Sequence, residues 1–370
     1  MAASGADTHR PSVALLRRLR ELADPDGFLP FDRYWEIAQY DPDVGYYAQE
    51  RSPLGTAGDF YTAPYVGSFF GQTIADRLLV RWRELGRPSP YRFVELGAGD
   101  GRLAFDVLER LADHRPEEAE WTYALVERSE PLRHLALERI RPAAERAGIT
   151  LEAPGSLSDG APYQGSILAN ELLDALPHRR LRRTAAGWAE LGVLVDGGQV
   201  HPGQRALTRI VPGGPLPEMH EGGTLDLSAE AEGLIREAAD ALVAGSVLFL
   251  DYGADEGRWS RSPGDGTVVA LREHRPLPDL LSEPGRSDLS AFVNFTRIRA
   301  AAGRAALKER YFGRQREALV AWGLPERIEE ATRAAATEAD RVRLQLQSKQ
   351  LLVGFENFWA LELGAGPEPG

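Results

Sequence analysis

The chain has 370 residues, of which 43% are apolar and 26% are charged, a composition typical of globular proteins with a substantial core. Its 43 basic and 55 acidic residues leave a net charge of −12, which disfavours nucleic acids and anionic membranes as partners. The absence of cysteine excludes disulfides, thiolate metal sites and cysteine nucleophiles, and no metal site is predicted.

The N-terminal segment mixes arginines with acids and lacks the apolar centre of a secretory signal. We therefore interpret it as the start of a mature cytoplasmic protein. No apolar run approaches the length of a membrane span, so no membrane partner is expected. Clusters of glycine and proline at 86–90 and 212–217 mark candidate boundaries between parts of the chain.

A glycine-rich loop follows the first convincing strand and is the most informative feature of the sequence. The strand carries Glu95 near its end, and the loop places Gly97, Gly99 and Gly101 just before a helix. Alternating glycines permit tight turns and let a ligand approach the backbone closely. A dinucleotide site would want its last glycine at position 102, where the chain has Arg102. The loop therefore predicts a nucleoside cofactor of another class; the alternative is an ordinary glycine-rich junction.

Strands and helices alternate through most of the chain. Strands are predicted at 93–96, 123–126, 149–151, 166–169 and 247–250, and helices at 103–111, 131–147 and 229–242. Because such alternation produces a parallel, doubly wound sheet, we predict an α/β fold whose ligand lies at the carboxyl ends of the strands.

Acids or amides stand at four of these strand ends, namely Glu95, Glu127, the pair Asn170 and Glu171, and Asp251. We expect them to face one crevice, where they would suit a ribose, an ammonium group and an acceptor nitrogen. Each of them alone could instead be a helix cap or a solvated edge residue.

Residues 178–227 interrupt this alternation. The segment 181–200 is patterned like a hairpin with a turn at Gly197 and Gly198, which indicates an insertion in the core. The segment 341–363 is expected to supply the last helix and strand of the sheet.

Seven further sequence blocks accompany the glycine loop. They are DVGYY at 43–47, GDFYT at 58–62, FFG at 69–71, ANELLDALP at 169–177, LDYG at 250–253, DLSA at 288–291 and GFENF at 354–358. Together they resemble the MidA-like methyltransferases, whose mitochondrial members are arginine methyltransferases and assembly factors for respiratory complex I. The resemblance runs in order over nearly the whole chain.

The resemblance implies a class I methyltransferase, with a doubly wound sheet, an N-terminal helical lid and an inserted subdomain before the fifth strand. The implied division is a lid region at 1–88, a core at 89–177 and 245–370, and an insertion at 178–244. S-adenosylmethionine is the implied cofactor, with Glu127 at its ribose. Asp59 of the lid is expected either to face its ammonium group or to cap a lid helix. The expected cofactor-binding residues are Gly58, Asp59, Phe60, Glu95, Gly97, Gly99, Gly101, Glu127, Asn170 and Glu171.

Two departures from the family pattern concern the substrate. The family's Ser-Pro-Glu tripeptide is Ala-Pro-Tyr here, ending in Tyr65, and the aspartate of its Val-Asp-Phe run is Asn294. Because paired carboxylates are the usual partners of a guanidinium group, losing two acids weakens arginine as the implied substrate. The alternative is drift at positions that only shape the lid.

Methyl transfer needs the acceptor lone pair in line with the methyl group, so positioning and desolvation supply most of the acceleration. For a guanidine acceptor, we assign Glu171 to bind the cation, with Asp174 in support. For a hydroxyl acceptor, His178 is the candidate base, because its ordinary pKa lies near neutrality. The alternative for His178 is a surface residue that begins the insertion.

Three functions remain open. The first is a methyltransferase acting on a protein side-chain nitrogen, that of arginine. The second is a small-molecule O- or N-methyltransferase, whose pocket would use the aromatic residues Phe60, Tyr61, Tyr65, Phe69 and Phe70; the alternative is that these residues only form the core of the lid. The third is a non-catalytic assembly factor. The sequence fixes neither the acceptor nor whether the chain forms a homodimer.

Overall fold

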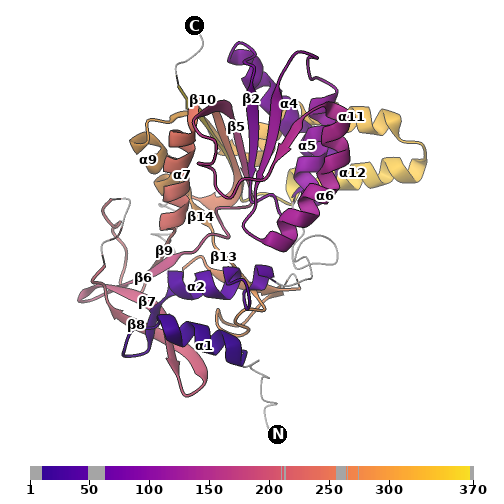
Figure 1. The fold of residues 1–370 in the computed structure, drawn as a ribbon. Helices are drawn as coiled ribbons and strands as arrows, with labels where there is room; N and C mark the ends of the chain where they lie inside the picture. The colour runs from indigo at the N-terminus through magenta and orange to yellow at the C-terminus, as the bar shows by residue number, and fades with distance from the viewer. Residues whose placement is uncertain are drawn as a thin grey trace.

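The structure is a computed structural model that describes residues 11–48, 63–209, 211, 214–255, 264, 266–273 and 275–366. A large α/β core carries a smaller, strand-rich unit at one end (Figure 1). The smaller unit lies at the bottom of that view, beneath the carboxyl ends of the core strands.

The core is built on an eight-stranded sheet. Its strands run in the order β15 (Lys308–Arg314), β16 (Phe358–Ala365), β10 (Leu242–Ala254), β5 (Tyr163–Asn170), β2 (Tyr91–Leu96), β3 (Trp121–Val126) and β4 (Thr150–Glu152), and β14 (Val293–Asn294) pairs with β10. The strands from β10 to β4 are parallel, whereas β16 is antiparallel to β10. The doubly wound α/β fold predicted from the alternating pattern is therefore confirmed.

Helices cover both faces of this sheet. One face is covered by α4 (Ser68–Glu84), α5 (Arg102–Ala112), α6 (Glu130–Ala147), α10 (Gln315–Ala321), α11 (Leu324–Ala334) and α12 (Glu338–Val353), and the other by α7 (Ala229–Ala241) and α9 (Phe295–Arg304). Successive strand residues point to opposite faces, so in β2 Phe93 joins the first of these two cores and Val94 joins the second. Burial on both faces explains why these strands are mostly apolar.

The smaller unit combines three distant parts of the chain. Its N-terminal part is α1 (Val13–Leu22), β1 (Phe28–Pro30) and α2 (Phe31–Tyr40); its middle part is β6 (Arg179–Thr184), β7 (Gly187–Asp196), β8 (Gln199–Ala206) and β9 (Thr224–Leu227); and its last part is β11 (Val269–Arg272), β12 (Arg275–Pro276) and β13 (Asp288–Ser290). A shared apolar core joins α1 and α2 to β7, β11 and β13. The expected turn at Gly197 and Gly198 connects β7 to β8, and both glycines have positive φ.

These contacts group the chain differently from the division implied by sequence order. Helix α4, from the predicted lid region, packs on the core sheet, as does α7 from the predicted insertion. Strands β11 to β13, from the predicted core, pack in the smaller unit. The apolar stripe of a helix predicts that it packs against another element, but it does not identify the sheet on which the helix packs.

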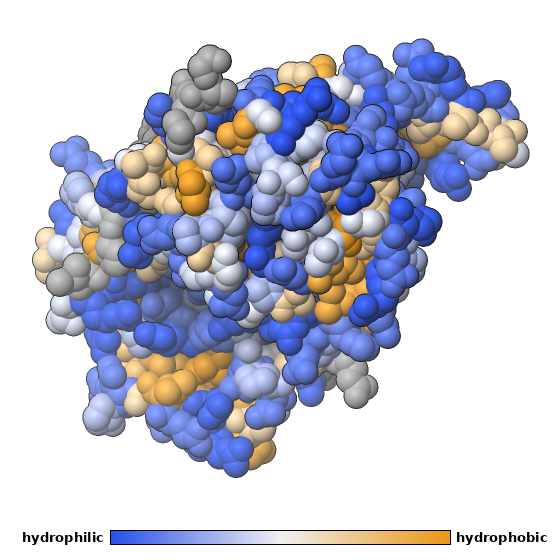
Figure 2. Space-filling model, turned by 45° about the horizontal axis from the view of Figure 1, so that its top comes forward, coloured by the Kyte–Doolittle hydropathy of each residue, from blue (hydrophilic) through white to orange (hydrophobic). Residues whose placement is uncertain are grey.

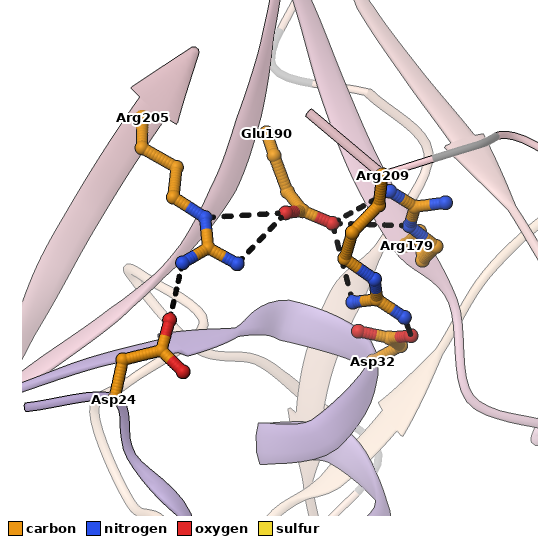
Figure 3. A network of polar contacts seen from close by, with 6 residues as sticks. All are labelled: Asp24, Asp32, Arg179, Glu190, Arg205 and Arg209. Atoms are coloured by element: carbon orange, nitrogen blue, oxygen red, sulfur yellow. Dashed lines mark hydrogen bonds and ion pairs between the residues drawn. The ribbon is translucent and has the colours of Figure 1, made fainter. Parts of the chain in front are cut away.

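Glu190 of β7 anchors the N-terminal part of the smaller unit (Figure 3). Its carboxylate is fully buried and forms ion pairs with three arginines, Arg179 at 2.7 Å and Arg205 and Arg209 at 3.3 Å each. Arg205 and Arg209 continue to Asp24 and Asp32 of the N-terminal segment. The network therefore ties α2 and the residues before β1 to the inserted sheet.

We expect Glu190→Gln to destabilise the protein by about 3 kcal/mol, because it leaves buried arginine charge without its central partner. Asp24→Asn is the matched control: its carboxylate is 45% exposed, so its loss should cost less than about 1 kcal/mol. Urea unfolding followed by circular dichroism measures both variants. A Glu190→Gln midpoint equal to that of the wild type would show that the network does not stabilise the fold.

Candidate active site

A crevice with a volume of about 410 Å³ opens where β2, β3 and β5 end. A smaller cavity of about 80 Å³ adjoins it and shares Gly97, Gly99 and Glu171 with it. Tyr40 and Tyr47 of the N-terminal part also line the crevice. The site therefore lies between the core sheet and the smaller unit.

The three glycines of the loop after β2 have left-handed backbone conformations, with φ of 65° at Gly97, 57° at Gly99 and 78° at Gly101. A Cβ atom at Gly101 would lie 2.8 Å from the Cα of Ala136 in α6, so this glycine allows α5 and α6 to pack. Gly97 and Gly99 line both cavities. Gly101 therefore allows the helices to pack, whereas Gly97 and Gly99 leave the backbone open to a ligand.

Glu127 stands at the end of β3 and holds the glycine loop in place. Its Oε2 accepts a hydrogen bond from the Gly99 amide at 2.9 Å, and its Oε1 accepts one from the Ser129 amide at 2.8 Å. Burial raises the pKa of Glu127, although these amides favour its charged form. The carboxylate lines the larger crevice and keeps lone pairs for further donors.

Glu95 lies deeper, at the smaller cavity. It is buried, and its Oε2 accepts a hydrogen bond from the Tyr123 hydroxyl. Burial raises the pKa of Glu95 to about 8. Glu95 and Glu127, both predicted from the sequence, therefore belong to the same site but line two different cavities.

Glu171 follows β5 and lines both cavities. Its backbone is left-handed, with φ of 51°, and its amide donates to the Leu250 carbonyl of β10 at 2.8 Å. Its Oε1 accepts hydrogen bonds from the Ala63 amide at 3.3 Å and from Asn170 Nδ2 at 3.2 Å. Burial, followed by the nearby charge of Asp174, raises the pKa of Glu171 to about 8.

Asp251 holds the turn that carries Glu171. Its Oδ2 accepts hydrogen bonds from the amides of Leu172, Leu173 and Asp174, at 3.1, 2.8 and 3.4 Å. Asp174 is buried beneath this turn, where the hydroxyl of Ser290 donates to it at 2.7 Å, and it lines neither cavity. Asp174 and Asp251 thus position the turn, while Glu171 faces the open space.

Tyr65, which stands where the family has glutamate, lines the smaller cavity. Its hydroxyl donates to Oδ2 of Asp100 at 2.5 Å, and Nη1 of Arg139 contacts the same oxygen at 2.7 Å. Burial and the hydrogen bond to Asp100 raise the pKa of Tyr65. This position therefore supplies a neutral hydroxyl bound to the glycine loop, and no carboxylate.

Two tyrosines that sequence reasoning gave no role form a wall of the larger crevice. The rings of Tyr40 and Tyr47 stack with their centroids 5.4 Å apart, and the guanidinium of Arg128 lies 4.4 Å from the Tyr40 ring. The Tyr40 hydroxyl donates to the Ala175 carbonyl at 2.6 Å. Tyr47 belongs to the DVGYY block, which was the only sequence signal for this wall.

Several sequence-predicted residues lie elsewhere. His178 is buried, with its Nδ1 2.7 Å from the Leu176 carbonyl and its ring against Trp35, and burial lowers its pKa. It lines neither cavity, so a role as general base has no geometric support. Phe69 and Phe70 are core residues of α4 and line neither of the two cavities. Gly58, Asp59, Phe60 and Tyr61 lie outside the described residues.

Asn294 also lies away from the crevice, where it caps α9. Its Oδ1 accepts a hydrogen bond from the Arg297 amide at 3.2 Å. Asparagine and aspartate are nearly equivalent at this helix position. The loss of a carboxylate here is therefore a change of cap and no longer counts against a basic acceptor.

We expect Asn294→Asp to change the free energy of unfolding by less than about 1 kcal/mol, because both residues cap helices. Methyl transfer to any acceptor should stay the same, since the side chain does not reach the crevice. Paired unfolding and turnover measurements check this, and a change of acceptor preference in the variant would contradict the assignment.

The residues at the crevice fit a nucleoside cofactor with an amino-acid end. Oδ1 of Asn170 is buried at the smaller cavity without a hydrogen-bond partner among the described residues, and it could accept from an ammonium group. Glu127 is placed for ribose hydroxyls, beside the open backbone of Gly97 and Gly99. The two cavities together have room for both ends of such a molecule.

The described part of the chain contains neither a membrane-spanning helix nor a metal-binding cluster. No helix there is sufficiently long and apolar to cross a membrane. Nor do three or more histidine, aspartate or glutamate side chains gather there in a way that could hold a metal ion.

Comparisons with known proteins point to one family. A family model for S-adenosyl-L-methionine-dependent methyltransferases matches residues 73–312. The protein arginine methyltransferase NDUFAF7 homolog of Drosophila melanogaster is 32% identical over 80% of this chain and 71% of its own length. The human protein arginine methyltransferase NDUFAF7 is 27% identical over 79% of this chain and 69% of its own.

A solved structure agrees over the full length. A Burkholderia thailandensis protein bound to S-adenosyl-homocysteine has 26% sequence identity and a TM-score of 0.83, with 100% of this chain and 96% of that chain covered. The resemblance noted in the sequence is thereby confirmed, as is S-adenosylmethionine as the cofactor.

The same comparisons contradict the predicted cytoplasmic location, which is wrong. The relatives from Drosophila, zebrafish and human are all named as mitochondrial proteins. The N-terminal composition argued only against a secretory signal, and it carried no information that separates the remaining compartments.

Proposed function

The chain belongs to the MidA-like family of S-adenosylmethionine-dependent methyltransferases, and from this premise we propose that it methylates arginine side chains of proteins. The proposal rests on the position of Glu171. This residue lines both cavities, and Asp251 holds the turn that carries it. The relatives named as protein arginine methyltransferases support the same acceptor.

The geometry of the crevice supports an assignment of the cofactor-binding residues. We assign Gly97, Gly99 and Asn170 to the amino-acid end of S-adenosylmethionine, and Glu127 to its ribose. Tyr40 and Tyr47 bound the same crevice on the side of the smaller unit. When bound, the cofactor supplies a methyl group on a positively charged sulfur.

Glu171 then has two tasks toward a guanidinium acceptor. As a carboxylate it accepts hydrogen bonds from the cation, which orients one nitrogen toward the methyl group. It also holds electron density on that nitrogen while the new nitrogen–carbon bond forms and the carbon–sulfur bond breaks, and it can accept the proton that the nitrogen then loses. Asp174 and Asp251 keep the turn rigid during this step.

Acidic residues at the mouth of the crevice also suit a basic acceptor. Glu230 and Glu237 of α7 line the opening, and Glu36 of α2 pairs with Arg128 beside it. Negative charge around an opening attracts cations and raises their local concentration.

The intact glycine loop and its hydrogen bond to Glu127 argue for catalysis over a purely structural assembly role.

Peptides that differ only at the acceptor test the proposal. We expect the protein to transfer label from S-adenosylmethionine to an arginine peptide, with tandem mass spectrometry placing the methyl group on a guanidine nitrogen. The same peptide with lysine in place of arginine is the control. Labelling of lysine alone, or of hydroxyl-bearing small molecules alone, would overturn arginine as the acceptor.

A further inference from the structure

The helical hairpin formed by α11 and α12 projects from the core (Figure 1). Few of its side chains are buried: Leu324 in α11, and Ser348 and Leu351 in α12. Figure 2 shows mainly pale-orange residues, of moderate hydropathy, along this otherwise blue arm. Apolar side chains exposed on a projecting helix pair are typical of an interaction site.

Helix α12 is apolar on two opposite faces. One face packs on the core through Leu351, with Leu344 and Leu352 against the same cluster. On the other face, Val342, Leu346 and Val353 are 46%, 63% and 55% exposed. Their spacing of four and seven residues places them in one stripe along the helix. A surface helix needs only one apolar face, and the exposed stripe packs against none of the described residues.

The charges of the hairpin favour a second copy as the partner. Residues 324–353 contain five acids and five basic residues, a balanced set in a chain of net charge −12. Two copies would repel each other over most of their surfaces, but not here. Such a neutral surface also offers nothing specific to a strongly charged partner.

The order of charges along the stripe further selects an antiparallel arrangement. Glu338 lies beside the stripe at the N-terminal end of α12, and Lys349 lies within it near the C-terminal end. When two copies of α12 pack antiparallel around a twofold axis, Glu338 of each copy comes near Lys349 of the other, and Val342 meets Leu346. A twofold contact of this kind uses the same patch on both copies and closes on itself.

We propose that two copies of this chain associate through the α11–α12 hairpins, with the stripes of α12 packed antiparallel into a four-helix contact. A link to the active site follows from the packing of α12. Leu351 of α12 and Phe355 just after it share a core cluster with Ala63 and Val66. These two residues belong to α3 (Ala63–Val66), the short helix that carries Tyr65. Association would therefore support the helix that closes one side of the smaller cavity.

The mass of the full chain in solution tests the proposal, because a monomer has 40.6 kDa. Light scattering after size exclusion should give twice this mass for the wild type. Leu346→Glu should raise the dimer dissociation constant by roughly 100-fold, since it places a charge at the centre of the contact. Val13→Glu is the matched control, because it adds the same charge at an 86% exposed apolar residue on α1 and should leave the dimer intact.

Charge exchange tests the antiparallel arrangement. Glu338→Lys and Lys349→Glu should each weaken the dimer, and the double variant should restore it. Circular dichroism must show that every variant is folded. A wild type that stays monomeric at all concentrations, or a Leu346→Glu variant that remains dimeric, would overturn the proposal, as would a double variant weaker than both single ones.

Discussion

Replacing Glu171 with glutamine should reduce turnover on an arginine peptide by about 100-fold, the typical effect of losing one well-placed polar group. The affinity for S-adenosylmethionine should change little. Glutamine keeps the size of the side chain and an oxygen that can accept from the Ala63 amide, but it has no charge to hold a guanidinium. Steady-state kinetics with titration calorimetry of the cofactor separates the two effects.

The dependence on pH gives this prediction a signature that a structural defect would not imitate. Because the pKa of free Glu171 is raised to about 8, the active carboxylate is scarce at pH 6 and complete above pH 9. With peptide and cofactor both below saturation, kcat/KM should rise about tenfold per pH unit and level off above about 8. Arginine stays protonated throughout, so the rise belongs to the enzyme.

Glu171→Gln should remove this rise. A wild-type profile that is flat between pH 6 and 9, or an unchanged rise in the variant, would exclude Glu171 as the titrating group. Loss of cofactor binding in the variant would instead assign Glu171 to the cofactor alone.

The second large effect is expected from Gly99→Val, which should weaken S-adenosylmethionine binding by roughly 100-fold. Because Gly99 lines both cavities, an added side chain should narrow the site, and valine resists the left-handed conformation with φ of 57° at this position. Titration calorimetry with S-adenosyl-homocysteine measures the loss.

Gly86→Val is the matched control. Gly86 also has a positive φ, of 81°, but no atom lies within 4 Å of an added Cβ, and it stands beyond the end of α4, away from the crevice. Its variant carries the backbone strain without filling the site, so cofactor binding should persist. Equal losses in both variants would attribute the effect to strain, and undiminished binding to the Gly99 variant would contradict the assignment.

The sequence predicted the parts of the site that depend on local order. Glu95 lies near the end of a parallel strand, and Glu127 and Glu171 directly follow two others. Parallel strands bring their carboxyl ends to one edge of the sheet whatever the rest of the chain does. The glycine loop was equally predictable, because its conformation is set by Gly97, Gly99 and Gly101 themselves.

Other features depend on packing between distant segments and have no local pattern. The stack of Tyr40 on Tyr47 forms only where the N-terminal part meets the core. His178 follows the Asn-Glu block closely in the sequence, yet its side chain lies in the protein interior against Trp35. Asn294 could be identified as a helix cap only when α9 was seen to begin directly after it.

The identity of the methylated atom tests the account most directly. Cell lysate incubated with the protein and isotopically labelled S-adenosylmethionine should gain label in the protein fraction, and tandem mass spectrometry should place it on arginine nitrogens. The Glu171→Gln protein, which retains the cofactor, should produce about 100-fold less of this label. Label found only in small molecules, or on side chains other than arginine, would contradict the proposed acceptor.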